Sequence, residues 1–178
     1  MNLPPLLRNK ISHICLAGLT PGSHSPNKTT INHLLKPIVD ELITLDSGVI
    51  IKTYQHPHGR LVRVQLLCLL GDLLATKKVA GFSSPNATKF CSWCHATCQS
   101  LKKLELGTSR KKTETFQAAQ DSKDASSEDH QEKLLKQTGV RWSELNRLSY
   151  WDPSQQVALG IMHNWLEGIL QAHWRIRV

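Results

Sequence analysis

The sequence predicts a mixed α/β fold with a polar, mostly helical second half, and three observations lead to this prediction. An apolar run over Leu61–Leu70 is typical of a strand buried on both faces. Apolar residues recur at helical spacing between Ile31 and Ile43. Between residues 100 and 137 polar and charged residues dominate, which is typical of a solvated helix pair or of a partly disordered connector.

The N-terminal part of the chain predicts one short strand followed by one helix. An apolar island, His13–Leu19, indicates a short buried strand. The apolar stripe that starts at Ile31 predicts a helix, for which Thr29 or Thr30 is the expected N-cap. The Asp-Ser-Gly stretch that finishes at Gly48 is expected to end this helix.

Three further elements are expected after this helix. The stretch Val49–Tyr54 predicts a strand. After the long apolar run, Leu73–Ala80 predicts a short helix that is closed by Gly81. Near the end of the chain, Val157–Trp174 is apolar at helical spacing and predicts a buried helix.

Composition bounds the class of protein. The chain has 178 residues, which favours a single domain, and a net charge of +8 from 22 basic and 14 acidic residues. This balance indicates a polyanionic partner, most often nucleic acid, or else ordinary solubility. No signal-peptide segment and no run of membrane-spanning length is present. We therefore expect a nuclear or cytoplasmic protein, neither secreted nor in a membrane, whose thiols stay reduced.

The stretch KFCSWCHATC, Lys89–Cys98, is the most unusual one in the chain. Cys91 and Cys94 form a Cys-x-x-Cys pair, whose two-residue spacer lets both sulfurs reach one zinc ion. One pair is only half of a zinc site, so two more ligands are needed. The candidates are His95, Cys98, His163 and His173.

Other chemistries also use this spacing. A thioredoxin-like redox pair is one alternative, and Trp93 between the cysteines is suggestive, but a serine-proline loop rather than a strand precedes the pair. A zinc deaminase is another, but it needs His-x-Glu upstream and a proline where this chain has Phe90. The third alternative has no chemistry: the two cysteines are buried and bind no ligand.

Asp72 follows the long apolar run directly, and two interpretations of it are open. A carboxylate at the end of a strand is a usual place for a metal-binding catalytic acid in α/β enzymes. An aspartate is also a good N-cap for the helix that is predicted to begin at Leu73. The local sequence favours the N-cap.

Several stretches, taken in their order along the chain, resemble one family. They closely resemble the transposase of CACTA (En/Spm-type) DNA transposons, particularly its fungal branch. The resemblance covers Asn2 to Trp174, and its most specific parts are the Asp72–Cys94 block and Met162–Asn164. The stretches are NLPPLLRNK, LAGLTPG, INHLLKPIVDEL, HGRLVRVQLLCLLGDLLATKKVAGF, FCSWC, GVRWSEL, YWDP and MHNWLEGILQAHW.

The resemblance implies a chemistry as well as a fold. The family is similar to DDE/D cut-and-paste transposases, whose core is RNase H-like and whose two aspartates and one glutamate hold two Mg²⁺ or Mn²⁺ ions. These ions activate water, and then a 3′-hydroxyl, for attack on DNA phosphodiesters. By resemblance, Asp72 is the second acid of this triad. The expected partner is therefore DNA, at transposon ends, and the resemblance leaves an oligomer open.

The same resemblance implies a zinc-pinned insertion. Residues 1–90 would be part of the RNase H-like core, and residues 91–178 a zinc-associated helical insertion whose polar connector spans about 100–137. The V(D)J recombinase catalytic subunit has a comparable arrangement. Cys91, Cys94 and His163 match the family's motifs, and His173 is the first choice for the fourth ligand over His95 and Cys98. Candidate DNA contacts near the active edge are Arg60, Arg63, Lys77 and Lys78.

The chain departs from the family pattern at the first aspartate and the final glutamate of the catalytic triad. The first aspartate is expected upstream of Asn2 and the final glutamate beyond Val178, so the chain resembles a middle piece of a transposase. Family members often carry an aspartate shortly before Met-His, where this chain has Gly160. One acid cannot assemble a two-metal centre, so we expect no catalysis by this chain alone.

Three functions are therefore carried forward from the sequence. The first is a piece of a DDE/D transposase that is inactive by itself. The second is a non-catalytic, zinc-stabilised module of transposase origin that binds DNA or another protein. The third is a thiol oxidoreductase that uses Cys91 and Cys94.

Overall fold

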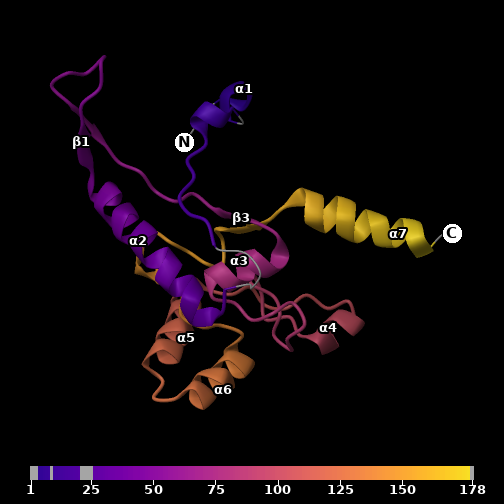
Figure 1. The fold of residues 1–178 in the computed structure, drawn as a ribbon. Helices are drawn as coiled ribbons and strands as arrows, with labels where there is room; N and C mark the ends of the chain where they lie inside the picture. Colours follow the sequence, from indigo (N-terminus) through magenta and orange to yellow (C-terminus); the bar gives the residue numbers. More distant parts are fainter. Residues whose placement is uncertain (1–3, 9, 21–25, 177–178) are drawn as a thin grey trace.

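A computed structural model describes residues 4–8, 10–20 and 26–176, without the side chain of His163 (Figure 1). It combines many helices with two small sheets, so the α/β class is confirmed in this general sense. The elements are α1 (Pro5–Arg8), η1 (Ile11–His13), α2 (Lys28–Ser47), β1 (Val49–Ile51), β2 (Arg60–Val62), β3 (Leu69–Gly71), α3 (Leu73–Ala80), α4 (Cys98–Lys102), α5 (Lys112–Asp124), α6 (Glu128–Thr138), η2 (Glu144–Arg147), β4 (Val157–Leu159), η3 (Met162–Leu170, a π-helix) and α7 (Gln171–Ile176). None of the helices in these ranges combines the length and apolar character that crossing a membrane requires.

Each sheet has two strands. β1 and β2 form an antiparallel hairpin beyond the C-terminal end of α2 (Figure 1). β3 and β4 are parallel, with Leu69 opposite Val157 and Gly71 opposite Leu159. Parallel strands need a long crossover connection, and here everything from α3 to η2 lies between the two strands.

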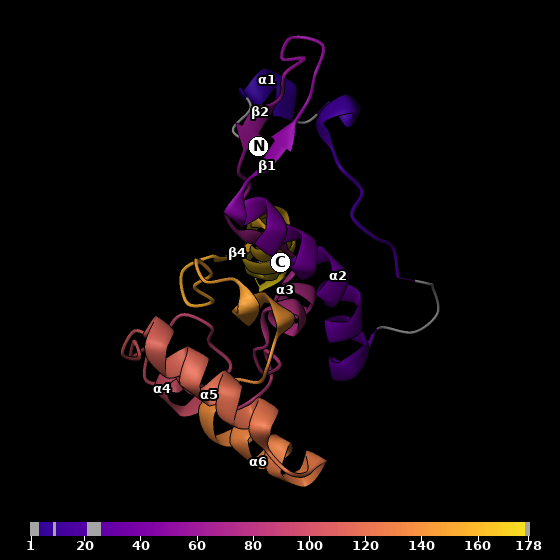
Figure 2. The ribbon, with the colours of Figure 1, turned by 90° about the vertical axis from the view of Figure 1, so that its left-hand side faces the viewer.

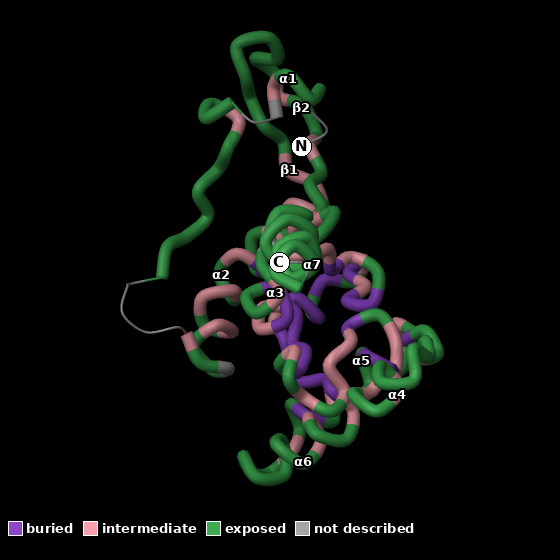
Figure 3. Tube along the Cα trace, turned by 90° about the vertical axis from the view of Figure 1, so that its right-hand side faces the viewer, coloured by how far each residue is buried: buried purple, intermediate pink, exposed green. Residues whose placement is uncertain are grey.

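The core lies where α2, α3, α5, η2 and β4 meet, and the buried stretches gather there in Figure 3. Its largest member is Trp151, which is 2% exposed. The other buried apolar members are Val39, Ala80, Phe82, Ala119, Val140, Leu145, Leu148 and Val157. Helices from both halves of the sequence thus share one apolar cluster.

The polar connector is a helix pair, which confirms the first of its two predicted forms. α5 and α6 lie side by side (Figure 2). The excursion that contains them is closed at its base by backbone pairing: Ser83 N–H donates to Gly139 O (3.0 Å) and Arg141 N–H to Gly81 O (2.7 Å). Both glycines have positive φ, and a Cβ on Gly81 would lie 2.5 Å from the Arg141 carbonyl oxygen. Glycine is therefore required where the two ends of the excursion meet.

The long apolar run was predicted as one strand buried on both faces, and this is wrong. It is divided between β2 and β3, which belong to different sheets, and Leu67 between them is 76% exposed. The backbone of the intervening segment bonds elsewhere: Val64 N–H donates to Leu45 O (3.1 Å) and Leu66 N–H to the Tyr150 hydroxyl (3.1 Å). The segment between β2 and β3 is therefore held by contacts to the end of α2 and to Tyr150.

Three other local predictions are also corrected. Residues 14–20 form no strand and are exposed, because no neighbouring strand pairs with them in the described part of the chain. The N-cap of α2 is Asn27, whose Oδ1 accepts from the amides of Thr29 (3.0 Å) and Thr30 (2.8 Å). The C-terminal helix begins only at Met162, after β4, and it projects from the body with most of its apolar residues exposed (Figures 1 and 3).

Candidate functional site

Asp72 lies between β3 and α3, so both interpretations of it describe its position. It directly follows the last residue of β3, and its carboxylate is exposed. Its Oδ1 accepts the amide of Ala75 at 2.8 Å, which makes it the N-cap of α3. The cap uses one of the two carboxylate oxygens, Oδ1. β3 belongs to a two-stranded sheet, so within the described ranges it is not a central strand.

The carboxyl ends of β3 and β4 meet at one edge. Since Gly71 is opposite Leu159, Asp72 and Gly160 leave the sheet beside each other. Gly160 N–H donates to Gly71 O at 3.0 Å, which fixes this arrangement. The first turn of η3 follows at once, and the Asn164 side chain donates to Gly160 O at 2.8 Å. The two most specific stretches of the sequence, around Asp72 and around Met162, are thus brought to the same edge.

Cys91 and Cys94 also come together. Their sulfur atoms are 3.4 Å apart, and both cysteines are free thiols. Two sulfurs bound to one tetrahedral zinc ion lie about 3.8 Å apart, given Zn–S bonds of ~2.3 Å. A shift of a few tenths of an ångström would bring both sulfurs to this spacing. The pair therefore fits half of a zinc site, and sulfur is a ligand type that zinc prefers.

The backbone around this pair is held from outside the motif. His95 N–H donates to Thr108 O (2.9 Å), and Arg110 N–H donates to Trp93 O (2.8 Å). The indole Nε1 of Trp93 donates to Val157 O at 3.1 Å, which ties the thiol pair to the start of β4. The pair is thus fixed against the parallel strands although it lies far from β4 in the sequence.

Two buried cations lie beside the thiol pair. Arg110, which is 4% exposed, donates from Nε to Cys91 O (3.0 Å) and from Nη2 to Thr138 O (3.0 Å). Lys77, also 4% exposed, donates from Nζ to Phe90 O. Burial lowers the pKa of both cations, and negative charge on Cys91 raises it again. The thiol pair therefore lies beside two desolvated cations.

The remaining zinc ligands stay a prediction. His95 Nε2 contacts Glu114 Oε1 at 2.7 Å, Cys98 is exposed at the start of α4, and His173 is exposed on α7. The side chain of His163 lies outside what the structure describes. In the described part, no three or more His, Cys, Asp or Glu side chains are grouped so that they could hold a metal ion.

The four candidate DNA contacts do not form one surface. Arg60 and Arg63 are exposed at the hairpin, which projects away from α3 (Figure 1). Lys78 is half-buried on α3. Lys77 is buried and its ammonium group donates to the carbonyl of Phe90, so it stabilises the fold.

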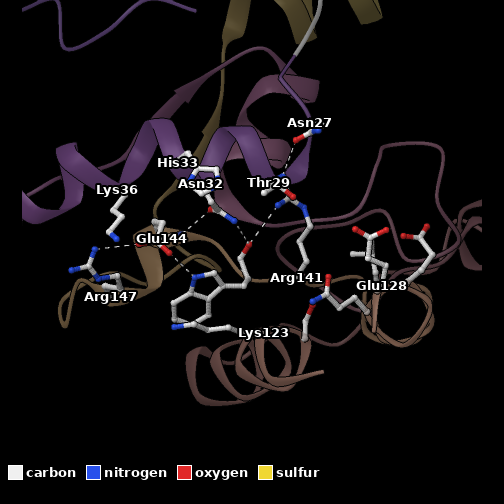
Figure 4. A pocket seen from close by; sticks show the side chains of 15 residues that line it. Asn27, Thr29, Asn32, His33, Lys36, Lys123, Glu128, Arg141, Glu144 and Arg147 are labelled. Atoms are coloured by element: carbon white, nitrogen blue, oxygen red, sulfur yellow. Dashed lines mark hydrogen bonds and ion pairs between the residues drawn. The ribbon is translucent and has the colours of Figure 1, made fainter. Parts of the chain in front are cut away.

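Sequence reasoning missed a polar cavity of about 870 Å³ between α2, η2 and the α5–α6 pair (Figure 4). Its side chains mostly bond one another. Asn32 donates to Trp142 O (3.4 Å) and accepts from the amide of Glu144 (3.0 Å). The Lys123 ammonium lies 3.9 Å from the centre of the Trp142 ring, and Arg147 pairs with Glu144 (3.2 Å). These contacts hold α2 against residues 142–147 and Trp142 against α5, which indicates a structural role.

Comparisons with known proteins add no family. No family model matches the chain, and neither the curated proteins nor the solved structures contain a match to it. The resemblance found in the sequence therefore remains a prediction.

The capping role of Asp72 gives a testable prediction. Asp72→Ala is expected to destabilise the protein by about 1 kcal/mol, because the amide of Ala75 loses its acceptor. Asp72→Asn is expected to stay within about 0.5 kcal/mol of the wild type, since asparagine caps helices as well as aspartate does. Urea denaturation measures both. Equal destabilisation by the two variants would show that the charge, and not the cap, matters for stability.

Proposed function

We propose that this chain is part of the catalytic region of a DDE/D cut-and-paste DNA transposase of the CACTA type, with Asp72 as the second acid of its metal-binding triad. The observation that carries the proposal is the position of Asp72. It is exposed and follows β3 directly, at the carboxyl edge of a parallel strand pair. In α/β enzymes, ligands and catalytic groups gather at this edge.

The register of the two strands supports the proposal further. The family often carries an aspartate shortly before Met-His, and the matching residue here, Gly160, lies beside Asp72. An acid at that position would place a second carboxylate at the same edge, as a metal site requires. With Gly160 in this place, β3 and β4 bring one carboxylate there. The chain alone is therefore not expected to cut DNA.

The exposed apolar surface is consistent with a larger core. Leu67, just before β3, and Leu70, within β3, are 76% and 64% exposed. Exposed apolar residues that lie together often mark a surface that packs against another element or partner. Further elements of an RNase H-like core, packed on this sheet, would cover such residues. Exposed apolar side chains also occur at Ile161 and along the C-terminal helix, at Met162, Trp165, Leu166, Ile169, Leu170, Trp174 and Ile176.

In the complete centre, Mg²⁺ or Mn²⁺ would activate the attacking oxygen and stabilise charge on the phosphate. The part that this chain supplies is the carboxylate of Asp72, a hard oxygen ligand of the kind that these ions prefer. The bond from Ala75 N–H to Oδ1 fixes the orientation of the carboxylate.

A second candidate is a zinc-stabilised module of transposase origin that binds DNA or another protein without catalysis. The observation that favours it is the 3.4 Å separation of the Cys91 and Cys94 sulfurs, in a loop held by contacts to residues 108–110. This candidate needs the zinc site but does not need Asp72, which makes the two functions separable by mutation.

The test uses iron as a probe of the metal site at Asp72. Fe²⁺ with ascorbate and peroxide generates hydroxyl radicals that cut a protein backbone next to the bound ion. We expect backbone cleavage close to residue 72 in Gly160→Asp, which supplies the second carboxylate beside Asp72, and we expect it to be competed by Mn²⁺ and lost when Asp72→Asn is added. Asp129→Asn, an exposed carboxylate on α6, is the matched control and should keep the cleavage. In parallel, nicking and strand-transfer assays with Mg²⁺ or Mn²⁺ are expected to show no activity.

Two results would contradict the proposal. Cleavage that is spread over the chain and unchanged in Asp72→Asn would remove Asp72 from any metal site and favour the non-catalytic module. Nicking that disappears in Asp72→Asn would keep Asp72 as a catalytic acid, but it would show that the remaining acids lie within this chain.

A further inference from the structure

A strongly basic cavity lies beside α3. It has a volume of about 570 Å³ and lies between α3, the loop of residues 83–89 and α6. Its charged lining consists of five basic side chains and one acidic one: Lys77, Lys78, Lys89, Lys136 and Arg141, with Glu132. We call it the lysine pocket.

The lysine pocket differs from the polar cavity of Figure 4 in its charge balance. Both are lined by Glu132, Leu135 and Arg141, so they lie on either side of these residues. The larger cavity carries three glutamates among its basic residues, and Glu144 there is bonded to Arg147 and Trp142. The lysine pocket has a single glutamate among its lining residues, so its positive charge is not balanced from within.

Two of the basic side chains in the lysine pocket are buried. Lys77 is 4% exposed and Arg141 7% exposed, and both donate to backbone carbonyls, of Phe90 and Lys78. Within residues 4–8, 10–20 and 26–176, neither forms an ion pair with a carboxylate. Burial lowers the pKa of both groups, because desolvation disfavours their charged forms. An anion in the pocket would offset this cost.

The neutral part of the lining indicates what kind of anion fits. Ser84, Asn86 and Thr88 are exposed at the rim and offer hydrogen-bond donors. Leu74, which is 63% exposed, adds apolar surface. The volume exceeds that of a single inorganic anion and suits an anionic group attached to a flat or apolar body.

We propose that the lysine pocket binds a phosphate ester, with the phosphate between Lys89, Lys136 and Arg141 and the attached ring against Leu74. Lysine and arginine bind phosphate through charge-assisted hydrogen bonds. Two sources share this chemistry: a free nucleotide and the terminal phosphate of a nucleic-acid strand. The proposal is independent of the transposase assignment, because it uses neither Asp72 nor the cysteine pair.

The experiment titrates the protein with adenosine 5′-monophosphate, and with adenosine and inorganic phosphate as comparison ligands, by calorimetry and by amide NMR shifts. We expect the nucleotide to bind more tightly than either comparison ligand, with shifts at Ser84, Asn86 and Thr88. Lys136→Glu is expected to weaken binding by about tenfold or more, since it reverses a charge at the phosphate. Lys133→Glu makes the same change on an exposed residue of α6 outside the pocket and should change affinity less than about twofold.

Three outcomes would overturn the proposal: equal binding of adenosine and its monophosphate, equal effects of Lys133→Glu and Lys136→Glu, or no binding at millimolar ligand. A short single strand with and without a 5′-phosphate then identifies the source. Preference for the phosphorylated strand over the nucleotide assigns the pocket to a strand end. Equal or weaker binding of the strand assigns it to a free nucleotide, and both results keep the phosphate ester as the ligand.

Discussion

Protein purified without chelator is expected to contain about one zinc ion per chain, and Cys91→Ser or Cys94→Ser is expected to lose it. The two sulfurs are already 3.4 Å apart, so little rearrangement is needed for both to bind. A structural zinc site contributes on the order of 10 kcal/mol of binding free energy, which is also folding free energy. We therefore expect either variant to unfold at much lower urea concentration. Metal analysis and urea denaturation, with and without chelator, measure the two effects.

Matched variants separate the candidates for the other ligands. Cys68→Ser removes an exposed thiol outside the motif and should change neither zinc content nor stability. His163→Ala is expected to lose zinc, as the family resemblance implies, and His173→Ala to weaken zinc binding. Zinc loss in Cys98→Ser, but not in the histidine variants, would place the site within residues 91–98.

The zinc site would be contradicted if the purified protein contained no metal and Cys94→Ser were as stable as the wild type. A disulfide between Cys91 and Cys94 that forms reversibly under mild oxidation would then favour the thiol oxidoreductase. The buried cations Lys77 and Arg110 are compatible with either outcome, since thiolates occur in both chemistries.

The helix after Asp72 shows what the sequence alone can predict. An aspartate before Leu73 and a glycine at position 81 predicted both ends of α3, because capping depends on residues within one turn of each other. The proximity of Cys91 and Cys94 was predicted for the same reason, since a two-residue spacer sets it. Predictions of this kind need no knowledge of distant contacts.

The pairing of β3 with β4 could not be predicted in this way. An apolar run shows that a segment can be buried, but it does not show which partner will bond its backbone. Here Tyr150 takes the amide of Leu66, and β3 begins only where Val157 is opposite Leu69. The same limit applies to Arg110, whose contacts with Cys91 and Thr138 join segments that are distant in the sequence.

The C-terminal stretch shows that apolar periodicity does not establish burial. Val157–Trp174 was predicted as one buried helix, but its first three residues form β4, and Gly160 then separates the strand from the helix. Helical spacing correctly predicted the helix from Met162 onward. The apolar side chains of this helix could be buried only against another surface, and within the described residues most of them are exposed.

Two tryptophans are expected to respond very differently to truncation, and this tests where the core of the chain lies. Trp151 is 2% exposed within the cluster formed by α2, α3, α5, η2 and β4, whereas Trp174 on α7 is 78% exposed. Trp151→Ala is expected to destabilise the protein by about 3–5 kcal/mol through lost burial and the cavity it leaves. Trp174→Ala is expected to change stability by less than about 0.5 kcal/mol. Urea denaturation of both variants is the measurement.

Trp151→Phe isolates the packing contribution. The indole Nε1 of Trp151 is buried and has no hydrogen-bond partner in the described part of the structure, so phenylalanine removes an unsatisfied donor while keeping most of the apolar ring. We expect it to cost about 1–2 kcal/mol, well below the alanine variant. A cost for Trp174→Ala as large as that for Trp151→Ala would mean that α7 packs in solution against a surface that this structure leaves open.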